Sequence, residues 1–150
     1  MKVLIITPGD KRLEHVASSF KQLLLSAFDR IEVDIVHLSA LASPEIIERH
    51  DVIVLGTPTI KNDIYWPLQV AVDAAMHRIP RDQIARKIAT GFTISDNLAD
   101  SSRNLEGILW AFTESNARVL EPLFLHDGDS GAREAEKLSK YIQDMKSILI

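Results

Sequence analysis

The residues best suited to chemistry gather in three short segments, and the first follows the opening apolar run. Thr7, Gly9, Asp10, Lys11 and Arg12 bring a hydroxyl, a glycine, a carboxylate and two cations to an expected helix start. Free N–H groups and the positive dipole end of a helix favour an anion there. The segment therefore predicts an anion site. A plain strand-to-helix turn, with Asp10 as the cap and two solvated cations, fits the same residues.

The second segment follows the most hydrophobic run of the chain and precedes two adjacent aromatics at positions 65 and 66. It contains Thr57, Pro58, Thr59 and Ile60. Because proline fixes φ, the peptide groups around the two threonines are set in advance and can face a ligand at little entropy cost. The flat faces of the aromatics suit a planar heterocycle. They are equally suited to anchoring a helix against the sheet or against another subunit.

The third segment lies at the end of a further apolar run and contains Thr93, Ser95 and Asp96. Neither the Walker pattern G-x-x-x-x-G-K-[ST] nor the dinucleotide pattern G-x-G-x-x-G occurs anywhere in the chain. The chain has no cysteine, and its five histidines form no local metal-ligand spacing. We therefore expect a small-molecule ligand at the three segments and no metal site.

The elements that must hold these segments alternate regularly along the chain. Apolar, β-branched runs predict strands over residues 2–7, 31–38, 51–55, 87–93 and 118–125, and stripes at helical spacing follow each of them. This alternation predicts one α/β domain over residues 1–150, a doubly wound five-stranded parallel sheet with helices on both faces. The expected strand order is 2-1-3-4-5, with the fifth strand at an edge because it contains Pro122. Ligands of such sheets bind beyond the carboxyl ends of the strands, where all three segments lie.

Bulk composition narrows the classes of function. The chain has 150 residues, of which 46% are hydrophobic and 25% charged, with a formal net charge of −4. A net negative charge argues against nucleic acid as the main partner, and no apolar run reaches the ~18 residues that a membrane span needs. A cytoplasmic location is the expectation.

Two stretches carry a resemblance to a known family. Asp51-Val-Ile-Val-Leu-Gly-Thr-Pro-Thr59 and Lys87-Ile-Ala-Thr-Gly-Phe-Thr-Ile-Ser95 look like the third and fourth strands of flavodoxin-like proteins. The likeness is greatest to NAD(P)H:quinone reductases and NADPH-dependent FMN reductases. It implies FMN as the cofactor, with the second segment against the flavin ring and the phosphate at the first helix, and NAD(P)H as a possible electron donor. Where the family has Gly-Asn-Thr at the phosphate, this chain has Lys11, Arg12 and Leu13.

Two functions remain open on these grounds. The first is an FMN-binding redox protein that passes electrons from NAD(P)H to a quinone or a flavin, or acts as an electron carrier. The second is a flavodoxin-like domain that has lost FMN and serves as a binding or assembly module. The resemblance favours the first function. Two departures point to the second: leucine at position 13 cannot donate to a phosphate, and the third loop has carboxylates where quinone reductases have glycines. A phosphoacceptor receiver domain is excluded, since no aspartate ends the third strand.

The same resemblance implies a homodimer or homotetramer. Exposed-looking aromatics point the same way, because Tyr65, Trp66 and Trp110 fall off the core-facing stripes of their helices.

Overall fold

Strands and helices alternate along the whole chain in the computed structural model, which describes residues 1–60 and 63–149. The elements are, in chain order, β1 (Lys2–Thr7), α1 (Lys11–Ala27), β2 (Glu32–His37), η1 (Leu38–Ala42), α2 (Glu45–Glu48), β3 (Val52–Pro58), α3 (Trp66–Met76), α4 (Arg81–Ile84), β4 (Ile88–Ser95), α5 (Leu98–Glu114), β5 (Arg118–Val119), β6 (Leu123–His126) and α6 (Gly131–Leu149). Residues 61 and 62 of the predicted second loop lie outside the described residues.

The strands form one sheet of order β2-β1-β3-β4-β5, with β6 also paired to β4, and every pairing between these strands is parallel. This confirms the predicted order. The most hydrophobic strand, β3, lies at the centre between β1 and β4, where both of its faces are covered.

The predicted fifth strand is not continuous, which corrects the expectation of one strand over 118–125. Its edge position is shared by β5 and β6, because Pro122 has no N–H to give to the ladder. The carbonyl of Glu121 accepts instead from the side chains of Thr90 (3.3 Å) and Tyr141 (2.7 Å). Burial of this hydroxyl raises the pKa of Tyr141 to about 12.

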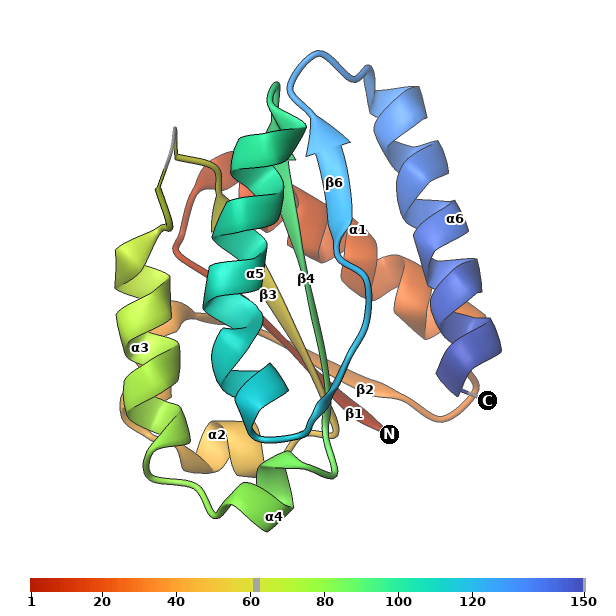
Figure 1. Ribbon diagram of the computed structural model, residues 1–150. Helices are drawn as coiled ribbons and strands as arrows, with labels where there is room; N and C mark the ends of the chain where they lie inside the picture. The colour runs from red at the N-terminus through yellow and green to blue at the C-terminus, as the bar shows by residue number, and fades with distance from the viewer. Residues whose placement is uncertain (61–62, 150) are drawn as a thin grey trace.

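Helices cover both faces of the sheet, as predicted (Figure 1). One core cluster joins α1 and α6 to the sheet, and a second joins α3 and α5 to its other face. In the first cluster Phe92 stacks on Phe20 at a centroid distance of 5.9 Å. Gly56 is required there, because a Cβ on it would lie 2.5 Å from the Phe92 ring.

The carboxyl ends of β1, β3, β4 and β6 meet at one edge, at the top of Figure 1. The three predicted segments are therefore brought together there. Within the described ranges, no helix is both long and apolar enough to cross a bilayer.

Candidate strand-end site

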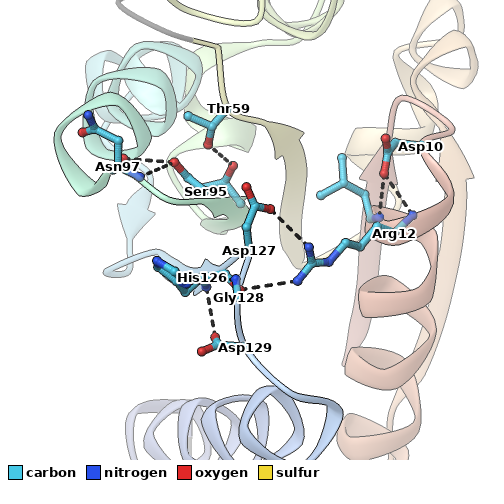
Figure 2. A network of polar contacts seen from close by, with 11 residues as sticks. Asp10, Arg12, Thr59, Ser95, Asn97, His126, Asp127, Gly128 and Asp129 are labelled. Carbon is cyan, nitrogen blue, oxygen red and sulfur yellow. Dashed lines mark hydrogen bonds and ion pairs between the residues drawn. The ribbon is translucent and has the colours of Figure 1, made fainter.

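The β1–α1 loop satisfies the start of its own helix. Asp10 is the N-cap of α1, and its Oδ1 accepts from the backbone N–H groups of Arg12 (2.9 Å) and Leu13 (3.1 Å). Gly9 reaches this cap at a φ of +91°, a conformation that glycine adopts without strain. Two of the amides that an anion at this helix start would use are thus occupied by a carboxylate of the chain itself (Figure 2).

The two cations of this loop, Lys11 and Arg12, differ in their partners. The Arg12 guanidinium donates to Asp127 Oδ1 (3.1 Å) and to the His126 carbonyl (3.4 Å), which ties α1 to the β6–α6 loop (Figure 2). Lys11 is exposed, and Thr7 is buried with an exposed fraction of 2%. Both cations face solvent, and among the described residues Lys11 is the one of the two that forms no ion pair.

The loop that holds Asp127 is itself fixed by charge. Asp129 accepts from Lys137 Nζ (2.7 Å) and from the backbone N–H of His126 (3.0 Å). The Lys137 hydrogen bond, followed by the bond from the His126 N–H, holds the pKa of the Asp129 carboxyl below its ordinary value. This anchoring sets the position from which Asp127 reaches Arg12.

The second segment turns its polar groups inward. Thr57 and Thr93 are fully buried, and Thr93 Oγ1 donates to the Thr57 carbonyl (2.6 Å). The hydroxyls of Thr59 and Thr93 lie 2.7 Å apart. The amide of Asn104, on α5, donates to the Pro58 carbonyl (2.7 Å). The threonines and Pro58 thus close a contact between β3, β4 and α5.

Two residues of α5 belong to this arrangement and were missed from the sequence. Asn104 is fully buried, and its Oδ1 accepts from the backbone N–H of Tyr65 (2.7 Å). Ser101 is 1% exposed, and its hydroxyl lies 3.4 Å from that of Thr59. Both are polar residues at i, i+3 positions on the apolar stripe that continues through Leu105 and Ile108. This interruption of the apolar stripe by two polar residues was the signal in the sequence that could have identified them.

The third segment forms the wall of an acidic hollow. Ser95 exchanges hydrogen bonds with the Asn97 backbone, and the Asn97 side chain caps α5. Asp96 is exposed. A hollow of about 380 Å³ opens here, lined by Thr59, Ile94, Ser95, Asp96, Asn97, Asp100 and Asp127. Three of these seven residues are aspartates, of which Asp127 is paired with Arg12, and the exposed carboxylate of Asp96 opposes the binding of an anion.

The residues present do not fit the phosphate of FMN. Its position at the start of α1 holds the Asp10 carboxylate, Arg12 is paired with Asp127, and Leu13 has no hydroxyl. The Leu13 side chain is 2% exposed and belongs to the core. At the ring end, Ile60 and Thr59 are half-buried, whereas the Thr57 and Thr93 hydroxyls face the protein interior.

No protein-family model matches the chain, and no curated protein matches its sequence. Solved structures do match. Oxidised flavodoxin 1 from Bacillus cereus is 20% identical and superposes with a TM-score of 0.77, the match covering 98% of each chain. A WrbA-like flavodoxin from Agrobacterium tumefaciens is 17% identical, with a TM-score of 0.72 over 98% of this chain and 95% of that one. The fold is flavodoxin-like.

General stress protein 14 of Treponema denticola, a structure in complex with FMN, is also similar: 15% identity, a TM-score of 0.63 and coverage of 99% of both chains. At such identities the likeness extends to the flavodoxin-like fold, and a shared fold does not carry its ligand with it. What this chain binds has to be argued from its own strand-end residues.

Proposed function

We propose that this chain is a flavodoxin-like binding module that has lost FMN as a resident cofactor. The observation that carries the proposal is the Asp10 carboxylate at the start of α1, 2.9 Å and 3.1 Å from the two amides it accepts from. A phosphate there would have to displace the cap, which is worth about 1 kcal/mol, and approach a fixed negative charge.

The adjoining hollow supports the same choice. A phosphate-bearing ligand would also meet the exposed Asp96 carboxylate, whereas a neutral molecule or one that donates hydrogen bonds would meet acceptors. We therefore expect the strand-end hollow to take a small molecule without a phosphate group.

A second candidate is the FMN-binding redox protein, passing electrons from NAD(P)H to a quinone or a flavin. Two observations favour it: the Thr57-Pro58-Thr59 segment after β3, and a structural neighbour solved in complex with FMN. This function requires FMN to bind although the start of α1 offers its phosphate few contacts.

The visible spectrum of the purified protein and parallel titrations with FMN and riboflavin separate the two. The two ligands differ by the phosphate, so the ratio of their dissociation constants measures what the protein gains from it. The proposal expects no flavin bands and FMN binding no tighter than riboflavin binding. A yellow protein, or FMN bound at least about tenfold tighter than riboflavin, contradicts it and supports the redox protein.

Two variants of Asp10 test whether its carboxylate is what opposes the binding of the FMN phosphate. Asp10→Gly removes the cap and the charge and should shift the preference toward FMN, because the two amides become available. Asp10→Asn keeps a capping oxygen and removes the charge, so it should shift the preference less. Asp82→Asn, which removes the same charge from the first turn of the distant α4, is the control and should leave the ratio unchanged. No change in Asp10→Gly means that Asp10 is not the barrier.

A further inference from the structure

A second hollow, of about 430 Å³, lies between α1 and α6, which pack together on one face of the sheet (Figure 1). We refer to it as the α1–α6 hollow. Its apolar wall consists of Leu23 on α1 and of Ala135 and Leu138 on α6. None of the described residues lines both this hollow and the strand-end hollow. The two hollows are therefore separate places on the molecule.

The polar wall of the α1–α6 hollow has unused hydrogen-bonding groups. Ser18, Ser19 and Gln22, all on α1, line it. In the part of the chain that the structure describes, no hydrogen bond joins these three side chains to another residue. The hollow can therefore offer hydroxyl and amide groups to a ligand without breaking a contact within the protein.

Glu134, in the first turn of α6, lines the same hollow and lacks a donor. Its Oε1 is buried, and no residue that the structure describes donates a hydrogen bond to it. The positive end of the helix dipole favours a carboxylate at this position. Because buried polar atoms without a partner are rare in folded proteins, this oxygen calls for a donor from outside the chain.

The cations nearest to Glu134 along α6 are paired with another carboxylate. Lys137 is three residues further along, a spacing at which helix side chains can pair, but its Nζ lies 2.7 Å from Asp129 Oδ2. Arg133 Nε lies 3.6 Å from Asp129 Oδ1. Among the described residues, no ion pair includes Glu134. The hollow thus holds a carboxylate beside an apolar wall, with no cation of the chain to neutralise it.

We propose that the α1–α6 hollow binds a small molecule that carries a primary ammonium group on a short alkyl chain. The ammonium group donates to the Glu134 carboxylate, and either oxygen can turn toward it because the last torsion of a glutamate has broad wells. A hydrogen bond between two charged groups is about twice as strong as one between neutral groups. The alkyl chain lies against Leu23 and Leu138, and further polar groups of the ligand meet Ser18 or Gln22. The proposal does not depend on what the strand-end hollow binds.

Titrations of the whole chain with n-hexylamine, n-butylamine and n-hexanol test this chemistry. At pH 8 the amines are protonated, as a lysine side chain is. n-Hexylamine should bind saturably and shift the NMR signals of the amides around Ser19 and Ala135. n-Hexanol lacks the charge and should bind at least about tenfold more weakly. n-Butylamine should also bind about tenfold more weakly, because two methylene groups fewer lie on the apolar wall. Absence of saturable n-hexylamine binding, or n-hexanol binding as tight, overturns the proposal.

Three single variants locate the amine. Glu134→Gln keeps the size of the side chain and removes its charge, so it should weaken n-hexylamine at least about tenfold and leave n-hexanol unchanged. Glu136→Gln removes the same charge from an exposed position on α6 that does not line the hollow. Asp96→Asn removes a carboxylate from the strand-end hollow. Both should keep the n-hexylamine affinity within about twofold of wild type.

Two outcomes of the variant series contradict the proposal. A loss in Asp96→Asn without a loss in Glu134→Gln means that the amine binds at the strand-end hollow. Equal losses in Glu134→Gln and Glu136→Gln mean that the amine responds only to the overall charge of α6. Circular dichroism checks that each variant is folded. If Glu134→Gln fails to fold, the wild-type comparison of n-hexylamine with n-hexanol decides.

Discussion

A Thr-Pro pair stands at the end of both β1 and β3, yet the polar groups of the two loops that follow are satisfied in different ways. After β1, the Asp10 carboxylate accepts from two backbone N–H groups, which lie two and three residues further along the chain. After β3, the Pro58 carbonyl accepts from the neighbouring Thr57 hydroxyl (3.2 Å) and, at a shorter distance, from the amide of Asn104 (2.7 Å), which is 46 residues away. The first loop is closed by local sequence, and the second is held by a helix on one face of the sheet.

This difference bears on how the family-like residues should be interpreted. The Thr-Pro-Thr segment retains the pattern of a flavin loop, but the hydroxyl of Thr93 and the amide of Asn104 bind its backbone from inside. The same residues thus have a structural role that needs no ligand. The first loop, which departs from the family pattern, is the one whose chemistry decides whether a phosphate can bind.

The largest loss of stability is expected from a change at the loop after β3. Asn104→Leu leaves the Tyr65 N–H without its acceptor and removes the shorter of two bonds to the Pro58 carbonyl, which keeps the bond from the Thr57 hydroxyl (3.2 Å). The substitution should lower the free energy of unfolding by about 2–3 kcal/mol. Urea denaturation measures it. Gln22→Leu, at an exposed position on α1, is the control and should stay within about 0.5 kcal/mol of wild type. An equally small change at position 104 would show that the loop does not depend on α5.

A smaller effect is expected at the first loop. Asp10→Ala removes the cap of α1 and should cost about 1 kcal/mol of unfolding free energy, since the Arg12 and Leu13 amides lose their acceptor. Asp10→Asn should retain most of that stability because asparagine caps comparably well. Both are measured by urea denaturation at neutral pH. If the Asn variant loses as much as the Ala variant, the charge and not the hydrogen bonds stabilises the helix start.

The smallest effect is expected from the ion pair that joins the first loop to β6. The side chains of Arg12 and Asp127 are 41% and 57% exposed, so their coupling energy in a double-mutant cycle of Arg12→Ala and Asp127→Ala should be about 0.2–1 kcal/mol. It should fall further in 1 M salt, where the Debye length is about 3 Å. A coupling above about 2 kcal/mol would mean that this contact, and not the Asp10 cap, closes the loop.

The sequence predicted the strand order and the two helical layers because these depend on the repeated spacing of apolar residues. It did not predict the break of the edge strand between β5 and β6. Pro122 indicated an edge, but the partner that replaces the missing ladder contact, Tyr141, comes from α6.

By itself, the sequence determined the parallel α/β sheet and the alternative in which Asp10 caps the first helix, because the apolar periodicity and the cap both act over a few residues. Only the tertiary structure decided that Asn104 completes the second loop and that Arg12 is paired with Asp127. These partners are 46 and 115 residues apart in the chain. Their side chains come within hydrogen-bond distance only because the parallel strands bring the loops and α5 to one edge of the sheet.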